Sequence, residues 1–250
     1  MKPAPFEYHA PASVTEAVSL LAELEDAKIL AGGQSLIPLL NFRLARPAHL
    51  VDINRLAELT KVYERDGGLA VGAAVRQADA ENHPLAAALC PLLPLALRLV
   101  AHPVIRNRGT VCGSLAHADP ASELCATLLA LDGRVVARSA RGEREIAAGD
   151  LFVGPMDSAL EPDELLVEAW FPASRGPFAI AEEARRHGDF ALAGAVRSGE
   201  RLALFGVAIR PLLADPADPT RGLEPSADAE CSPGFRLHLV REMVARVMSA

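Results

Sequence analysis

Two short β-like stretches each run into a glycine-bearing turn that carries a small hydroxyl side chain, and this pairing constrains the fold most. The first turn, AGGQS at residues 31–35, follows an expected strand at 28–30. The second, TVCGS at 110–114, follows Val104 and Ile105, where another strand is expected. Turns without bulky side chains let several backbone N–H groups approach one anion, and hydroxyls add donors. Two such turns suit a diphosphate bridge that is held from two sides.

Neither turn has the spacing of a familiar phosphate-binding fingerprint. The patterns GxGxxG and GxxxxGK[ST] do not occur at these turns, so a Rossmann or Walker site is excluded there. A glycine turn taken singly is explained as well by a backbone that needs a positive φ angle. The combination of two turns, both lacking bulky charge, is what favours a shared ligand.

Composition places the chain among soluble globular proteins with room for one large domain or two modest ones. Of its 250 residues, 50% are hydrophobic and 23% are charged, which is ordinary for such proteins. A net charge of −7, only 4% aromatic residues and the lack of a basic block argue against a nucleic-acid surface. The sequence shows neither a signal peptide nor an apolar run of membrane-spanning length, so a cytoplasmic location is expected.

The cysteines predict no metal site of the chain's own. Cys90, Cys112, Cys125 and Cys231 form no CxxC pair, and no His/Cys cluster has zinc or iron–sulfur spacing. Buried thiols are expected instead.

Local patterns predict alternating helices and strands. Ser13 and Glu16 fit a capping box for a helix at 12–24, Gly67-Gly68 indicates a hairpin within 59–75, and Asp119 with Pro120 fits the start of a helix at 120–131. The remaining expected elements are a broken helix at 35–47, a strand at 49–53, one or two helices at 84–101, strands at 134–138 and 164–171, a linker at 172–177, two strands within 190–209, an irregular stretch at 214–234 and a helix at 235–249.

The two turns with their flanks, AGGQSLIPLLNFRLARP and RNRGTVCGSLAHADPASE, resemble the FAD-binding medium subunit of molybdenum hydroxylases of the carbon monoxide dehydrogenase and xanthine dehydrogenase type. The resemblance begins at PAPFEYHAPASVTEAVSLLAE and resumes at ARRHGDFALAG and LALFGV. It implies an α+β protein with a PCMH-type FAD-binding domain at 1–176, made of two α/β subdomains at about 1–55 and 56–176. A small antiparallel sheet plus helix domain at 177–250 follows, shortened relative to the family.

The resemblance implies that FAD is the cofactor and that backbone amides of both loops hold its pyrophosphate. It places Glu123 near the ribose and adenine, Lys28 near the cofactor, Phe190 at the isoalloxazine, and Leu165 or Leu166 in the flavin region. The full set of expected cofactor-binding residues is Lys28, Leu30, Ala31, Gly32, Gly33, Gln34, Ser35, Leu36, Ile105, Thr110, Val111, Cys112, Gly113, Ser114, Asp119, Glu123, Leu166 and Phe190.

Several of these residues also have purely structural explanations. Lys28 fits a surface charge, Asp119 a helix cap, Glu123 a helix-dipole partner, and Phe190 core packing. Cys112 departs from the family, which commonly has glycine there, and a neutral thiol is expected beside a phosphate site. The stretch around Glu182 and Glu183 lacks a lysine that some relatives place near the flavin. His117 fits a structural role as well as a cofactor contact.

The resemblance further implies an electron-transfer role without catalytic residues on this chain. A large molybdopterin-binding subunit would oxidise the substrate, and a small [2Fe–2S] subunit would pass electrons to FAD here and on to an external acceptor. The complex is expected to be a dimer of heterotrimers, with the molybdopterin cofactor and [2Fe–2S] clusters only in partner subunits. Two alternatives stay open: a stand-alone FAD-dependent oxidoreductase, and a non-catalytic assembly protein that has lost flavin.

Overall fold

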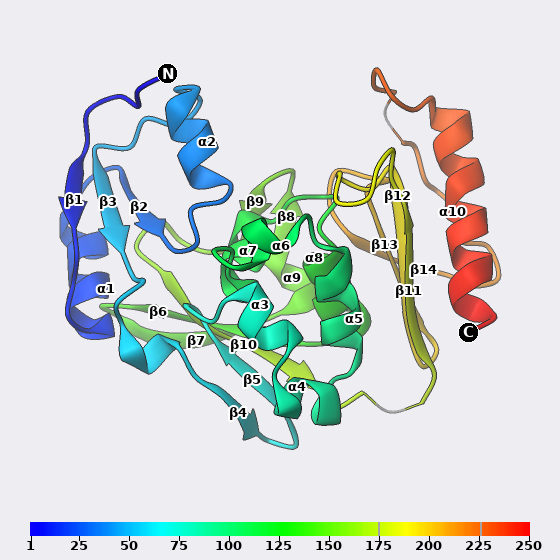
Figure 1. Ribbon diagram of the computed structural model, residues 1–250, viewed down its shortest axis with the longest axis horizontal. Coiled ribbons are helices and arrows are strands. Elements are labelled where there is room, and N and C mark those ends of the chain that lie inside the picture. The colour runs from blue at the N-terminus through cyan, green and yellow to red at the C-terminus, as the bar shows by residue number, and fades with distance from the viewer. Residues whose placement is uncertain (175, 226) are drawn as a thin grey trace.

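Three larger β-sheets lie in chain order along the described part of the protein, besides a fourth sheet of only two short strands. The computed structural model describes residues 1–174, 176–225 and 227–250. Figure 1 shows a small N-terminal sheet at the left, a five-stranded sheet in the middle and a four-stranded sheet with the C-terminal helix at the right. This arrangement gives the α+β fold that the sequence predicts.

The first sheet is parallel and has the order β1-β3-β2. Helix α1 covers it and begins as predicted, because the hydroxyl of Ser13 accepts a hydrogen bond from the Glu16 N–H at 3.1 Å. Pro38 sits in the first turn of the short helix α2. The bounds are β1 (Glu7–His9), α1 (Val14–Glu23), β2 (Ala27–Leu30), α2 (Leu36–Asn41) and β3 (His49–Asp52).

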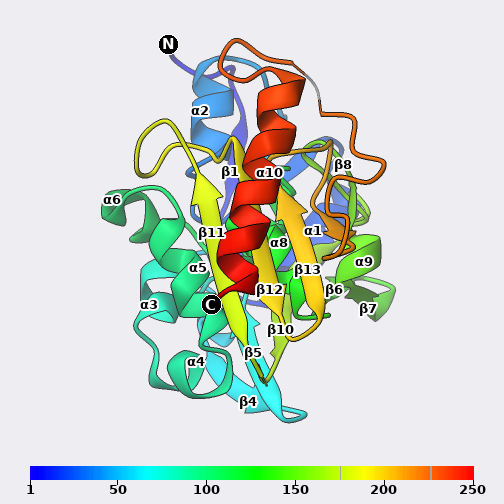
Figure 2. The ribbon, with the colours of Figure 1, turned by 90° about the vertical axis from the view of Figure 1, so that its right-hand side faces the viewer.

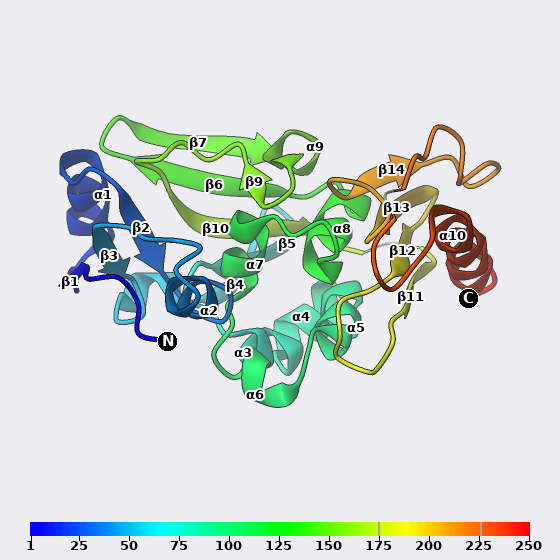
Figure 3. The ribbon, with the colours of Figure 1, turned by 90° about the horizontal axis from the view of Figure 1, so that it is seen from above.

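The second sheet is antiparallel and has the order β4-β5-β10-β6-β7. Its strands are β4 (Val62–Arg65), β5 (Gly68–Gly72), β6 (Arg134–Ser139), β7 (Gly142–Ala147) and β10 (Leu165–Pro172). The associated shorter elements are the 3-10 helix η1 (Ala57–Leu59), α3 (Gln77–Glu81), α4 (Pro84–Leu89), α5 (Leu92–Leu99), α6 (Pro103–Arg106), α7 (Val111–His117), α8 (Glu123–Ala130), α9 (Ala148–Leu151), β8 (Phe152–Gly154) and β9 (Asp157–Ser158). Figure 3 shows β6, β7 and β10 on one side of the molecule and α3 to α6 on the other.

The third sheet consists of β11 (Phe178–Glu183), β12 (Ala193–Ser198), β13 (Arg201–Phe205) and β14 (Leu212–Ala214). Helix α10 (Pro233–Met248) packs across its outer face, as Figure 2 shows. Arg236 fastens this helix to the sheet, because its guanidinium donates to the carbonyls of Leu192 and Gly206 and pairs with Asp228. The opposite face receives α5 and α8.

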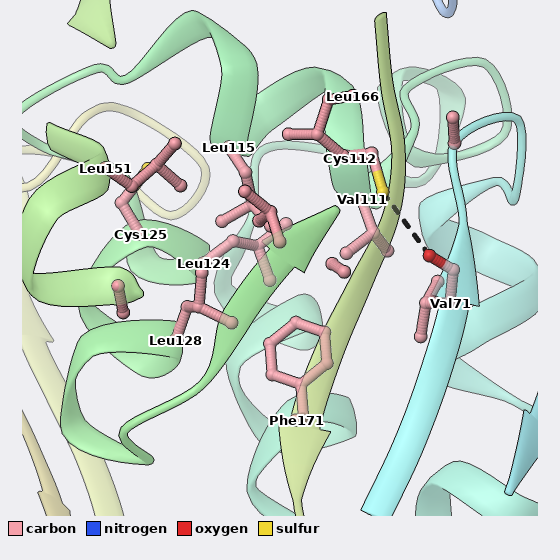
Figure 4. Close-up of a cluster of buried hydrophobic side chains, with 14 of the residues drawn as sticks. Val71, Val111, Cys112, Leu115, Leu124, Cys125, Leu128, Leu151, Leu166 and Phe171 are labelled. Carbon is pink, nitrogen blue, oxygen red and sulfur yellow. Dashed lines mark hydrogen bonds between the residues drawn. The ribbon is translucent and has the colours of Figure 1, made fainter. Parts of the chain in front are cut away.

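Two groups of buried side chains hold these layers together. The larger core cluster runs from α1 through both of the first two sheets to Phe205 on β13, whereas the smaller one joins the third sheet to α10. Figure 4 shows part of the larger cluster, where α7 packs on both β10 and α8. The three sheets fall within the predicted ranges 1–55, 56–176 and 177–250, and the domain boundaries themselves stay a prediction.

Two local predictions are wrong. Val104 and Ile105 lie in helix α6, not in a strand, because Pro103 occupies the first helical position, where its fixed φ favours a helix. Helix α8 begins at Glu123 and is capped by Ser122, whose hydroxyl accepts from the Cys125 N–H. Asp119 instead accepts from the Ala121 N–H at 2.8 Å in the preceding turn. The predicted linker at 172–177 includes Arg175, which lies outside the described residues.

Candidate functional site

A cleft opens where the first glycine loop, the N-terminal end of α7 and the β11–β12 connection meet. One part has a volume of about 350 Å³, and a neighbouring part of about 570 Å³ shares Ile29, Ala31, Leu36, Gly113 and His117 with it. Small-molecule sites usually occupy volumes of this order. Of the predicted residues, the first part is lined by Ala31, Gly32, Gly33, Gln34, Ser35, Leu36, Ile105, Thr110, Gly113, Ser114, Asp119, Glu123 and Phe190.

The remaining predicted residues are divided between the second part of the cleft and the protein interior. Lys28, Cys112 and Leu166 line the second part. Leu30 and Val111 are not among the lining residues of either part. Val111 is fully buried in the core, and Leu30 ends β2 directly before the loop. The structure therefore brings nearly all predicted residues to one continuous cleft.

The first loop needs glycine at two positions for two different reasons. Gly33 has a φ of 75°, which a residue with a side chain rarely adopts. A Cβ on Gly32 would lie 2.4 Å from the Arg108 carbonyl oxygen and 2.7 Å from the Cα of Gly109. The backbone before the second predicted turn therefore lies directly against the first loop.

Backbone N–H groups of the first loop have no hydrogen-bond acceptor among the described residues. Gly33, Gln34, Ser35 and Leu36 donate no backbone hydrogen bond to any other described residue. The hydroxyl of Ser35, at the start of α2, makes no capping bond either. Such a row of donors without an acidic side chain between them is suited to an anion.

The second predicted turn is the N-terminus of helix α7 and not a hairpin-like bend. Thr110 is its N-cap, and its hydroxyl accepts from the Gly113 N–H at 3.1 Å. The Ser114 hydroxyl accepts from the Gln77 side-chain amide at 2.9 Å. A Cβ on Gly113 would lie 2.5 Å from the Thr110 hydroxyl oxygen, so this glycine preserves the cap. The N-terminal end of the helix adds a partial positive charge to the cleft.

A chain of hydrogen bonds ties the two loops together. The Asn54 side-chain amide donates to the Ala31 carbonyl at 2.8 Å, and its oxygen accepts from Arg76 at 2.6 Å. The other end of the Arg76 guanidinium donates to the Arg108 carbonyl at 2.5 Å. These contacts, here called the loop clamp (Asn54 and Arg76), fix the distance between the loops.

Sequence reasoning did not identify Asn54, Arg76 or Gln77. Their partners lie far away in the chain, so no local spacing pattern marks them. One usable signal is the position of Arg76 and Gln77 in the sequence. They directly follow a buried apolar segment, residues 68–75, which contains β5, and polar residues at the end of such a segment often lie at the edge of a sheet. Gln77 is buried and bonds both to Ser114 and, through its backbone N–H, to Gly109.

The carboxyl group of Glu123 lines the cleft, and a second, that of Glu182, lies close enough to influence it. Burial raises the pKa of Glu123 to about 8, and the charges of Glu182 and Asp119 add to the increase. Burial also raises the pKa of Glu182 to about 7. One oxygen of Glu182 is buried without a hydrogen-bond partner among the described residues. Uncompensated buried carboxylates are costly, so the Glu182 carboxyl group has unsatisfied capacity for polar contacts.

The structure bears on the expected roles of three residues, Phe190, Cys112 and Lys28. Phe190 is 72% exposed and lines the cleft, so it is not a core residue. Cys112 points into the core and lies 3.4 Å from the Val71 carbonyl (Figure 4). Burial raises the pKa of its thiol, with a smaller contribution from Glu168, and a raised pKa favours the neutral form. Lys28 is exposed on β2 and also lines the second part of the cleft.

The arrangement fits an extended dinucleotide whose central diphosphate meets the two loops. The N–H groups of the first loop supply donors, and Cβ atoms at Gly32, Gly33 or Gly113 would disturb the loops that form this cradle. The two connected parts of the cleft leave space on both sides of the loops. The fold and the site therefore define a two-loop dinucleotide-binding protein.

Comparisons with known proteins agree with this class. Residues 4–174 match the family described as the FAD binding domain in molybdopterin dehydrogenase. The chain is 40% identical over 281 aligned residues to the 6-hydroxypseudooxynicotine dehydrogenase complex subunit alpha of Paenarthrobacter nicotinovorans, covering 100% of this chain and 95% of that protein. It is 39% identical over 216 residues to the carbon monoxide dehydrogenase medium chain of Hydrogenophaga pseudoflava, covering 84% and 75% respectively.

A solved structure of carbon monoxide dehydrogenase from Hydrogenophaga pseudoflava, one that lacks the Mo-pyranopterin moiety of the molybdenum cofactor, superposes with a TM-score of 0.94. It is 35% identical and covers 100% of this chain and 98% of the other. The chain belongs to the family of FAD-binding medium subunits of molybdenum hydroxylases. It is an oxidoreductase subunit, and its cofactor is FAD. Among the described residues, no helix is both long and apolar enough to cross a bilayer.

Proposed function

We propose that this chain transfers electrons between a [2Fe–2S] subunit and an external acceptor within a molybdenum hydroxylase complex. The observation that supports this most is the contact between the two glycine loops at one cleft, since it creates a diphosphate cradle from two distant segments. When bound, FAD supplies the redox chemistry, and the protein contributes binding and orientation.

The chain's own residues divide this task along the cleft. Backbone N–H groups of the first loop bind the diphosphate, and the N-terminal end of α7 adds its dipole. Glu123 accepts hydrogen bonds from the ribose side, where its burial excludes water. Phe190 covers one end of the cofactor, and Leu166 and Lys28 lie beside the other part of the cleft.

Exposed apolar side chains around the cleft support a partner subunit there. Phe42 is 66% and Leu44 is 76% exposed directly after α2, and Val104 on α6 is 70% exposed. Figure 3 shows α6 and the β11–β12 connection on the side of the molecule away from β7. Large exposed apolar side chains are found at protein interfaces. The partners would be a large molybdopterin-binding subunit and a small [2Fe–2S] subunit, in a dimer of heterotrimers.

The alternatives differ from this proposal in what the isolated chain can do. A stand-alone FAD-dependent oxidoreductase would turn over substrate alone, and an assembly protein without flavin would not hold FAD at all. The intact loops argue against the second alternative. The expected cytoplasmic location and the shortening of the C-terminal part relative to the family stay predictions.

The deciding experiment is co-purification of the chain with the subunits encoded beside it, followed by flavin, iron and molybdenum analysis. We expect one FAD per chain, flavin reduction by substrate in the complex and none in the isolated chain. Substrate turnover by the isolated chain would favour the stand-alone enzyme. A colourless chain that FAD cannot reconstitute would favour the assembly protein.

A further inference from the structure

Away from the cleft, three potential metal ligands converge on the first sheet. Glu7 and His9 stand two residues apart on β1, so they share one face of the strand. His49 lies on β3 in parallel register opposite Glu7. The ligand atoms of the three side chains all lie within 4.8 Å of one another. Two adjacent strands of a hydrogen-bonded sheet thus hold all three ligands.

The spacing of these atoms matches a tetrahedral metal centre. The Nε2 of His9 lies 3.1 Å from the Nδ1 of His49, and that Nδ1 lies 3.7 Å from the Oε2 of Glu7. Zinc binds nitrogen and oxygen ligands at about 2.0–2.2 Å, so neighbouring ligands of a tetrahedron stand about 3.4 Å apart. The observed separations lie on either side of this value.

We propose that Glu7, His9 and His49 bind a divalent transition metal, with zinc as the best match. Two imidazoles and one carboxylate favour zinc, copper or nickel over magnesium and calcium, which prefer oxygen ligands. Without a metal, the two imidazoles share one hydrogen bond, so a cation replaces a proton between them. The fourth position faces solvent beside Glu7, whose side chain is 75% exposed, and water completes the site.

The metal gives the N-terminal strand a second side-chain link to β3, besides the hydrogen bond from the Tyr8 hydroxyl to Asp52 at 2.6 Å. β1 has three residues and forms the edge of its sheet, pairing with β3 alone. A short edge strand frays readily. A cation that joins β1 to β3 therefore holds this edge strand to the rest of the first sheet.

The test is titration of chelator-treated, FAD-loaded protein with zinc chloride in a calorimeter. We expect one zinc per chain, no binding of magnesium, and increased protection of the β1 amides from hydrogen exchange. His9→Gln and His49→Gln are expected to lower the zinc affinity at least about 100-fold, and Glu7→Gln about tenfold. His238→Gln is the matched control, because His238 is exposed on α10.

Retained FAD content and an unchanged circular dichroism spectrum show that each variant is folded. Glu7→Gln is the variant that we expect to disturb folding least, because the Glu7 side chain is mostly exposed. No zinc binding by the unsubstituted protein overturns the proposal. Zinc affinity that stays the same in His9→Gln and Glu7→Gln overturns it as well, because the ion then binds elsewhere.

Discussion

The two glycine loops look alike in sequence but differ in how their polar groups are used. In the first loop, the N–H groups of Gly33 to Leu36 and the Ser35 hydroxyl make no hydrogen bonds with other described residues. In the second, Thr110 caps Gly113 and Ser114 bonds to Gln77. The first loop therefore presents donors to a ligand, whereas the second is stabilised internally and shapes the cleft. Similar motifs can thus serve different purposes within one site.

The largest expected effect comes from breaking the first loop. Gly33→Val places a β-branched residue at a φ of 75°, with its Cβ 3.0 Å from Ile37. The loop must change conformation, and we expect FAD affinity to fall at least about 100-fold, because the donor row is lost. Fluorescence titration of the apoprotein with FAD measures this change.

Gly67→Val is the matched control for Gly33→Val. Gly67 has a φ of 70° in the β4–β5 hairpin, with no atoms within 4 Å of an added Cβ. It bears a similar backbone strain away from the cleft, so the melting temperature should fall while FAD affinity stays the same. Equal FAD affinities in the two variants would contradict the role assigned to the first loop.

The loop clamp should have the next largest effect. Arg76→Met removes the hydrogen bonds to Arg108 and Asn54 that join the loops, and we expect about a tenfold loss of FAD affinity. Arg76→Lys should recover only part of it, because one ammonium cannot replace the forked guanidinium. Arg98→Met, on the exposed face of α5, controls for loss of charge. Unchanged affinity in Arg76→Met would show that the loops keep their spacing without the clamp.

Because the carboxyl group of Glu123 is buried, we expect the stability of the apoprotein to depend on pH. The pKa of Glu123, about 8, lies above that of an unfolded glutamate, so the folded apoprotein binds more protons between about pH 4.3 and 8. The free energy of unfolding must therefore fall as pH rises through this range. Glu123→Gln cannot ionise, so we expect the amount by which its free energy of unfolding exceeds that of the parent to grow by about 3 kcal/mol between pH 5 and pH 8.

Urea unfolding of the apoproteins at both pH values measures this difference. Glu200→Gln, on the exposed β12–β13 turn, serves as the control and should leave the pH dependence as it is. A Glu123→Gln variant whose stability falls with pH as steeply as that of the parent would contradict the assignment.

Much of the fold follows from local signals in the sequence. The capping box of α1, the Gly67-Gly68 hairpin and the amphipathic helix α10 were all predicted, because each depends on residues close together in the chain. Strand β1 was missed, since three residues carry little periodicity. Helix α6 was assigned as a strand because the β-branched pair Val104 and Ile105 was given more weight than the preceding proline.

The candidate site likewise has parts that the sequence predicts and parts that it does not. Both loops were predicted from their glycine and hydroxyl pattern, and the resemblance to a known family extended that prediction to Glu123 and Phe190. The loop clamp could not be predicted, because Arg76 meets Asn54 and Arg108 only after the first two sheets have come together. The sequence does not show that the second loop begins a helix, because a threonine such as its N-cap, Thr110, is equally common in turns.

The smallest expected effect separates the two loops most directly, because it compares the same substitution in each. Ser35→Ala removes a hydroxyl that faces the cleft without an internal partner, so FAD affinity should fall about threefold while apoprotein stability is unchanged. Ser114→Ala leaves the buried Gln77 amide without its acceptor, so apoprotein stability should fall by about 1 kcal/mol. Paired FAD titrations and urea unfolding curves measure both quantities. If Ser35→Ala destabilised the apoprotein and Ser114→Ala did not, the ligand-facing and structural roles of the loops would have to be exchanged.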